Sequence, residues 1–176
     1  MIVLVGFMGA GKSTVGRLLA EQLALPFADS DEVIEQAIGL SIAEIFEGFG
    51  EAGFREIEAR VIEEQLAGPP GVLALGGGAV TSEAVRAALV GHHVVLLQIS
   101  LADALSRVGG DPRRPLLHRH DLERVFAGRA GHYRAVATLM IAAAGRSPQV
   151  IAREIATAVA DHDALPLDPA APEAGE

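Results

Sequence analysis

Short apolar runs alternate along the chain with longer segments in which apolar residues recur at helical spacing. The runs, which predict strands, lie at residues 2–5, 26–28, 72–75, 94–99 and 139–143. Helical patterns follow at 14–23, in the long region between the second and third runs, at 83–89 and at 148–159. This alternation is typical of an α/β fold with a mainly parallel sheet, whose right-handed crossovers place helices on both faces.

Polar or glycine-rich residues follow directly after three of the predicted strands. The first strand leads into a segment with three glycines, the second into Asp29-Ser30-Asp31, and the third into Gly76-Gly77-Gly78. Because the carboxyl ends of parallel strands meet at one edge of the sheet, we expect these segments to lie together and to form a ligand site.

The segment after the first strand reads Gly-Phe-Met-Gly-Ala-Gly-Lys-Ser-Thr from residue 6 to residue 14 and fits the pattern G-x-x-x-x-G-K-[ST]. Backbone N–H groups of such a loop, helped by the following helix dipole, bind phosphate oxygens. A chance glycine-rich turn is the alternative, but Lys12 is the only lysine among fourteen Lys and Arg residues. We therefore predict a nucleotide-binding loop in which Lys12 reaches the β- and γ-phosphates and the Ser13 hydroxyl binds Mg²⁺. The loop residues expected at the nucleotide are Gly9, Ala10, Gly11, Lys12, Ser13 and Thr14.

Length, composition and charge narrow the class of protein. The 176 residues are 50% apolar, which suits one domain with a full core. Without cysteine, the chain has no disulfide framework and no thiol nucleophile, and the net charge of -9 argues against nucleic-acid binding. With a strand predicted at Met1 and no apolar run of roughly 18 residues, we expect a cytoplasmic protein without a signal peptide or membrane span. The proline-rich residues 163–176 are expected to be a disordered tail.

Asp29 and Asp31 follow the second predicted strand and have two possible roles. Either could cap a helix that begins near Glu32, but capping needs only one carboxylate. Beside a phosphate loop, one carboxylate can hold Mg²⁺ or its waters and the other can accept a proton from a substrate hydroxyl. We favour this division of tasks.

Further candidates carry weaker signals. Arg55 and Glu58, at i and i+3 of a predicted helix, form either a solvated surface pair or an oriented fork for a substrate carboxylate. The three glycines at 76–78 are either a flexible connection or a place where a ligand touches the backbone. From residue 109 to 134 the chain is rich in arginine; most of these are expected on the surface, and one or two are expected to close over the nucleotide as part of a lid.

These motifs, in this order, resemble the shikimate kinase family over nearly the whole chain up to about residue 160. The resemblance rests on the phosphate loop extended to Gly16, Asp-x-Asp, Phe-Arg-x-x-Glu, the triple glycine with Ala79-Val80, and Arg114-Pro115-Leu116-Leu117. It implies a P-loop NTPase-like three-layer sandwich with a five-stranded parallel sheet of order 2-3-1-4-5. It also implies a single kinase domain at 1–160, with a substrate-binding helical segment at about 31–67 and a lid at about 111–124.

The resemblance further implies a monomer that transfers the γ-phosphate of ATP to the 3-hydroxyl of shikimate, on the route to chorismate and the aromatic amino acids. Asp29 matches the carboxylate that holds Mg²⁺ through water, and Ser13 its direct ligand. The catalytic residues are expected to be Lys12, Asp31 and Arg114. Residues matching the shikimate site are Asp31, Arg55, Gly77 and Arg129, and the neighbouring Gly76 and Gly78 are expected to contact the substrate with Gly77. Residues outside the loop that match the nucleotide site are Arg107, Arg114, Arg146 and Pro148. The chain departs from the family pattern at Gly131, where proline is common.

Two alternatives remain at this point. A related P-loop kinase, such as a gluconate kinase, would share the loop but is not expected to carry the Asp-x-Asp, Phe-Arg-x-x-Glu and triple-glycine set. A catalytically silent nucleotide-binding module would be expected to lose Lys12, Asp31 or the lid arginine, and all are present.

Overall fold

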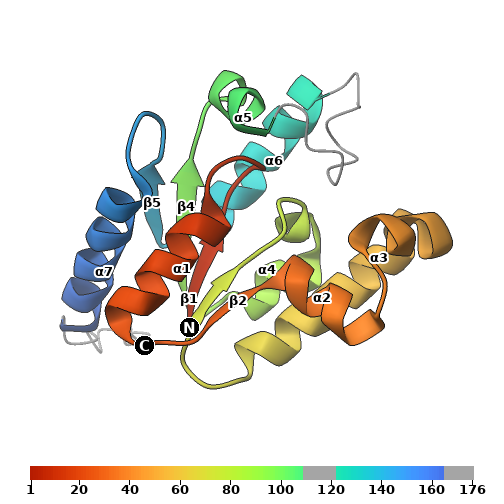
Figure 1. The fold of residues 1–176 in the computed structure, drawn as a ribbon, viewed down its shortest axis with the longest axis horizontal. Coiled ribbons are helices and arrows are strands. Elements are labelled where there is room, and N and C mark those ends of the chain that lie inside the picture. The colour runs from red at the N-terminus through yellow and green to blue at the C-terminus, as the bar shows by residue number, and fades with distance from the viewer. Residues whose placement is uncertain (109–121, 165–176) are drawn as a thin grey trace, which may run out of the picture.

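The computed structural model describes residues 1–108 and 122–164, and its centre is a parallel sheet of order β2-β3-β1-β4-β5 (Figure 1). Each of the five predicted runs forms one strand of this sheet. The strands are β1 (Ile2–Val5), β2 (Phe27–Asp29), β3 (Val72–Ala74), β4 (His93–Gln98) and β5 (Leu139–Ala142). In β1, Val3 pairs with Leu73 of β3 on one side and with Val94 of β4 on the other. The predicted α/β class and strand order are confirmed.

Helices cover both faces of this sheet and make it the middle of three layers (Figure 1). They are α1 (Lys12–Leu23), α2 (Ser30–Ile38), α3 (Ile42–Leu66), α4 (Glu83–Ala88), α5 (Leu101–Val108), α6 (Leu122–Val136) and α7 (Pro148–Ala164), with a 3₁₀ turn, η1 (Ala79–Thr81). Within residues 1–108 and 122–164, no helix combines the length and the apolar character needed to cross a bilayer.

Side-chain alternation along β1 divides the core in two. Ile2 and Leu4 pack into the cluster under α1 and α7, whereas Val3 and Val5 pack into the cluster formed with α3, α4 and α6. All four are buried, as expected for a central parallel strand covered on both faces. Such a strand is rigid, so it fixes the position of the loop that begins at its carboxyl end.

Some predicted boundaries differ from the observed ones. The second helix begins at Ser30 rather than near Glu32, because the Asp29 side chain caps it by accepting a hydrogen bond from the Asp31 N–H. The last helix continues to Ala164, so residues 163 and 164 are helical, and the rest of the predicted tail lies outside the described residues. Of the predicted lid at 111–124, only 122–124 are described, and they form the start of α6.

Candidate active site

The loop between β1 and α1 has backbone geometry that its glycines make possible. Gly9 and Gly11 have φ of 76° and 92°, in the left-handed region that residues with a side chain adopt at a cost. The helix then starts at Lys12, and its first bond runs from the Val15 N–H to the Gly11 carbonyl at 2.8 Å. The loop therefore ends at the N-terminus of a helix, where N–H groups without helical partners favour an anion.

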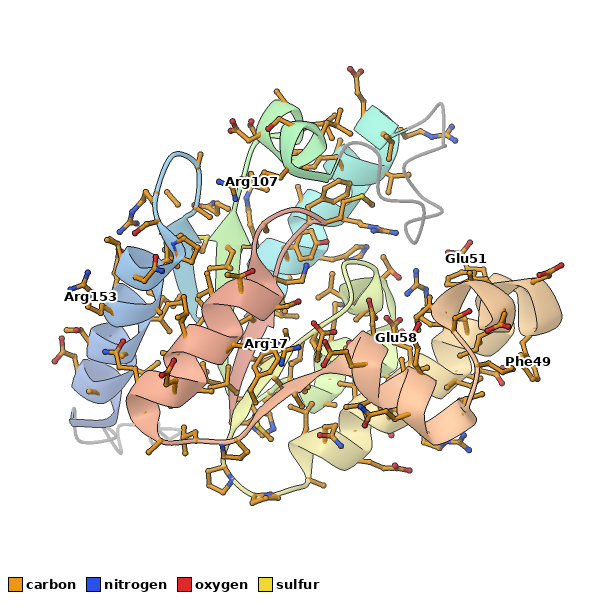
Figure 2. All side chains as sticks on the ribbon, viewed as in Figure 1. Arg17, Phe49, Glu51, Glu58, Arg107 and Arg153 are labelled. Atoms are coloured by element: carbon orange, nitrogen blue, oxygen red, sulfur yellow. The ribbon has the colours of Figure 1, made fainter. Side chains whose placement is uncertain are left out.

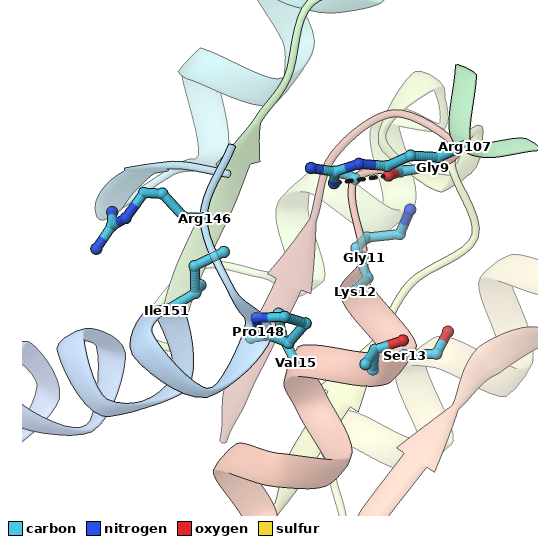
Figure 3. Close-up of a pocket in the computed structure, with 11 residues that line it drawn as sticks. Gly9, Gly11, Lys12, Ser13, Val15, Arg107, Arg146, Pro148 and Ile151 are labelled. Atoms are coloured by element: carbon cyan, nitrogen blue, oxygen red, sulfur yellow. Dashed lines mark hydrogen bonds between the residues drawn. The ribbon is translucent and has the colours of Figure 1, made fainter. Parts of the chain in front are cut away.

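A cavity of about 540 Å³ opens over this loop, and it brings together every described residue predicted at the nucleotide (Figure 3). Besides the loop residues from Gly9 to Thr14, its walls include Arg107 of α5, Arg146 between β5 and α7, and Pro148 at the start of α7. Arg114 lies outside the described residues. Val15 and Ile151 also line the cavity and were missed in the sequence, where they look like ordinary apolar helix positions.

Hydrogen bonds hold the cationic side chains of this cavity against backbone carbonyls. The Lys12 ammonium donates to Gly6 O at 2.8 Å and to Phe7 O at 3.2 Å, so it lies against the loop. Arg107 connects the loop to the end of β5 by donating to Gly9 O at 3.2 Å and to Ala143 O at 3.0 Å. Arg146 donates to Ala142 O at 3.1 Å and pairs with Glu154. Cationic side chains from α1, from α5 and from the connection between β5 and α7 thus line the cavity, which suits a polyphosphate.

Ser13 and Asp29 meet beside the loop, where the Ser13 hydroxyl donates to Asp29 Oδ2 at 2.5 Å. The other oxygen of Asp29 accepts the Asp31 N–H at 3.1 Å, so this one carboxylate both caps α2 and faces the loop. In the part of the chain that the structure describes, no three His, Cys, Asp or Glu side chains form a metal cluster. A hydroxyl and one carboxylate fit Mg²⁺, which prefers oxygen ligands and usually keeps several waters while binding substrate phosphates.

The three glycines at 76–78 lie where side chains from α2 and α3 converge. A Cβ atom on Gly76 would stand 2.7 Å from Asp31 Oδ1 and 2.9 Å from Glu58 Oε1, and one on Gly78 would overlap the Arg55 guanidinium. The charged groups can approach the backbone this closely because side chains are absent there. This observation favours the close-approach interpretation of the glycines over a merely flexible connection.

Arg55 is held by two carboxylates of its own helix, α3. It lies 2.5 Å from Glu58 and 3.6 Å from Glu51, which is one turn away (Figure 2 labels both acids). Glu58 is only 1% exposed, so the alternative of a solvated surface pair is wrong for this residue. Burial raises the pKa of Glu58 to about 7, even though the neighbouring Arg55 acts to lower it.

A second arginine reaches the glycines from α6. Arg129 is buried, and its Nη1 donates to the carbonyl of Gly77 at 3.1 Å. Burial lowers its pKa. The same carbonyl accepts the Tyr133 hydroxyl at 2.5 Å. The structure therefore brings together all the residues predicted at the acceptor site: Asp31, Arg55, Gly76, Gly77, Gly78 and Arg129.

Two polar residues of this site were missed in the sequence. Ser30 is completely buried and its hydroxyl accepts the Gly76 N–H at 2.8 Å, which fixes the glycines to the start of α2. The Tyr133 hydroxyl donates to the carbonyl of Gly77 and so holds this glycine to α6. Ser30 gave a weak signal by standing between two aspartates. Tyr133 follows Arg129 at i+4, a spacing that has meaning only on the observed helix α6.

Fold and site together define a class: a small P-loop kinase with a nucleotide cavity and an adjacent acceptor site that contains arginines and carboxylates. Residues 8–160 match the family model described as shikimate kinase. The chain belongs to the shikimate kinase family, whose members are ATP-dependent small-molecule kinases.

Individual relatives agree with this membership. The shikimate kinases of Mycobacterium tuberculosis (strain CDC 1551 / Oshkosh) and Salinispora tropica are each 50% identical over 157 residues. The alignments cover 87% of this chain and 89% of the former, and 88% of this chain and 94% of the latter. The structure of the Acinetobacter baumannii shikimate kinase in complex with shikimate has a TM-score of 0.88 at 38% identity, covering 93% of this chain and 94% of that one.

A gluconokinase from Sinorhizobium meliloti 1021 is similar in fold alone, with a TM-score of 0.58 and 21% identity over 92% of this chain and 91% of that one. The family match favours shikimate kinase over the gluconate kinase alternative.

Proposed function

We propose that this protein transfers the γ-phosphate of ATP to the 3-hydroxyl of shikimate, giving ADP and shikimate 3-phosphate on the route to chorismate. The observation that carries the proposal is the convergence of Asp31, Arg55 and Arg129 on the three glycines, next to the phosphate loop. Shikimate has a carboxylate and three hydroxyls, so it needs cationic groups at one end and a carboxylate at the other. This site has both.

The nucleotide is proposed to occupy the cavity over the phosphate loop, with the loop N–H groups and Lys12 on its phosphates and Arg107, Arg146 and Pro148 near the adenine. Ser13 would hold Mg²⁺ directly and Asp29 would hold it through water. When bound, the ion neutralises phosphate charge and orients the phosphates. Arg114, outside the described residues, is proposed to act from a lid at about 111–124.

On the acceptor side, Arg55 and Arg129 are proposed to bind the shikimate carboxylate, and the glycine backbone to line its ring. Asp31 would accept the proton of the 3-hydroxyl as its oxygen attacks the γ-phosphorus and the bond to the ADP oxygen breaks. Lys12 would stabilise the charge that develops on the transferring phosphoryl group. The residues at about 31–67, which include α2 and most of α3, are proposed as the substrate-binding segment.

The protein is proposed to act as a cytoplasmic monomer. Both parts of the site are built from residues of one chain, so a second copy is not needed to complete it.

A coupled ADP-release assay with shikimate, gluconate or no acceptor tests the function. We expect release that depends on shikimate and on Mg²⁺, and no release by a folded Lys12→Ala variant. Equal release with gluconate, or release without any acceptor, would reject the assignment. In the same assay, Asp31→Asn is expected to lose about 10²–10⁴-fold in kcat, whereas Asp29→Asn is expected to need more Mg²⁺.

A further inference from the structure

We propose that Tyr133 is a positioning residue of the acceptor site: its hydroxyl fixes the Gly77 carbonyl, and that carbonyl orients the Arg129 guanidinium toward the substrate. The inference rests on the proposed function, because it assigns a task to the arginine that is proposed to bind the substrate carboxylate. Two donors meet at one acceptor, with Tyr133 Oη at 2.5 Å and Arg129 Nη1 at 3.1 Å from Gly77 O.

Backbone N–H groups of the following 3₁₀ turn donate to the carbonyls on either side of the Gly77 carbonyl, from Ala79 to Gly76 O and from Thr81 to Gly78 O. The two donors to Gly77 O are instead side chains of α6. Gly77 stands between two other glycines, so no side chain in the run restricts its rotation, and a Cβ on Gly77 would find only ordinary contacts, the nearest being Met8 N at 3.4 Å. An arginine fork binds a carboxylate well only if its plane is held in one orientation. The carbonyl that holds this fork must itself be anchored.

Tyr133 can supply that anchor because its ring is embedded in the core. The residue is 5% exposed and packs in the cluster between α3, α4, α6 and the sheet. It follows Arg129 at i+4, so both side chains leave the same face of α6 and reach the same peptide. A rigid aromatic side chain loses little entropy when its hydroxyl is held in place. One helix therefore supplies both the substrate-binding arginine and the group that fixes its partner.

Tyr133→Phe keeps the ring and removes only the hydroxyl. We expect the KM for shikimate to rise about three- to tenfold, as for the loss of one buried hydrogen bond, with kcat and the KM for ATP within about twofold of wild type. The matched control is Thr81→Val. Thr81 Oγ1 donates a hydrogen bond to the carbonyl of Gly78 at 2.7 Å. This variant therefore also removes one hydrogen bond between a hydroxyl and the glycine run, but at a carbonyl that does not accept from Arg129. It is expected to leave the KM for shikimate within about twofold.

A double-mutant cycle separates this role from simple packing. If Tyr133 acts through Arg129, then Tyr133→Phe in an Arg129→Lys background should add little to the KM for shikimate. The inference is overturned if the two effects multiply, if Thr81→Val raises this KM as much as Tyr133→Phe does, or if Tyr133→Phe leaves it unchanged. Shikimate-dependent ADP release by the wild type, measured in the same series, shows separately whether the proposed function holds.

Discussion

In the acceptor site, charged side chains occupy the space that side chains at the three glycines, residues 76–78, would otherwise fill. Gly78 has φ -100° and ψ -14°, which any residue can adopt, so its conformation does not explain why glycine is there. The reason is space, because a Cβ would overlap the Arg55 guanidinium. Glycine at position 78 therefore leaves space for the Arg55 side chain and is not needed to form a turn.

Gly78→Ala is therefore expected to displace Arg55 and raise the KM for shikimate about tenfold or more, while the KM for ATP and the melting temperature change little. Arginine is flexible enough to move away, so the fold should survive. Gly131→Ala is the control, since its Cβ would meet nothing within 4 Å and Gly131 is not part of the proposed site. Steady-state kinetics with each substrate varied in turn checks the pair. Equal effects of the two substitutions would contradict this account.

The protonation state of Glu58, a residue of the acceptor site, affects the free energy of unfolding. Its pKa in the folded chain is about 7 against an ordinary value of 4.5, because it is buried. Between these two values the folded state holds the proton that the unfolded state has lost, so the free energy of unfolding falls as the pH rises through this window. Glu58 thus costs stability in its charged form while it pairs with Arg55.

We predict that the free energy of unfolding of the wild type falls between pH 5 and pH 8 by about 2–3 kcal/mol more than that of Glu58→Gln, at about 1.4 kcal/mol per unit of pKa shift. Glu51→Gln is the control, because Glu51 lies on the other side of Arg55 but is 64% exposed. Its pH profile should run parallel to that of the wild type. Urea unfolding at several pH values tests this, and parallel profiles for Glu58→Gln and the wild type would refute it.

At the scale of elements, the site depends on how closely the helix after the phosphate loop packs on the sheet. Gly16 of α1 faces Phe27 of β2 and Leu4 of β1, and a Cβ there would overlap the Phe27 ring and stand 3.2 Å from Leu4 Cδ1. On α6, in contrast, a Cβ on Gly131 meets nothing within 4 Å. Close packing therefore leaves no room for a side chain at Gly16, whereas a side chain at Gly131 would have free space.

Gly16→Ala is expected to lower the free energy of unfolding by about 1–3 kcal/mol through overpacking. Gly131→Ala is expected to raise it by about 0.5–1 kcal/mol, because alanine loses less backbone entropy in a helix. Denaturant titration measures both, and the opposite signs make each variant the control of the other. Destabilisation by Gly131→Ala would mean that α6 is constrained in a way that the open space around Gly131 does not indicate.

At the scale of the whole molecule, the nucleotide and acceptor parts of the site share the carboxyl edge of the sheet but use different residues. The cavity over the loop is lined by α1, α5 and α7, whereas the acceptor site is built by α2, α3, α6 and the glycines after β3. The net charge of -9 opposes an anionic substrate, so affinity must come from these local arginines.

Thermal shifts should separate the two parts. At about 100 times the dissociation constant, MgADP or shikimate should each stabilise the wild type by about 2.7 kcal/mol, or roughly 5–10 °C for a chain of this size. Lys12→Ala should lose most of the thermal shift with MgADP and keep the shift with shikimate. Arg55→Lys should lose most of the shift with shikimate and keep the shift with MgADP. Loss of both shifts in either variant would show that the two parts are not independent.

The local sequence determined much of this protein. Apolar runs predicted the five strands, because burial on both faces of a parallel sheet requires continuous apolar strands. Helical spacing predicted α1, α4, α7 and the region that holds α2 and α3, but it did not predict α5 and α6. The loop from Gly6 to Thr14 was predicted because its function depends on residues that are adjacent in the chain. The order of the motifs was sufficient to predict the strand order through the family resemblance, and the carboxyl-edge rule predicted that the polar segments would meet.

The tertiary structure alone decided the environment of the side chains. The spacing of Arg55 and Glu58 is the same in a surface pair and in a buried one, and only packing against the sheet and the glycines made Glu58 a buried acid with a raised pKa. Tyr133 and Gly77 are 56 residues apart, so the bond between them exists only once α6 lies beside the loop after β3. Burial and long-range contacts depend on where the whole chain goes, which is why local patterns could indicate the residues of the site but not how these residues hold one another.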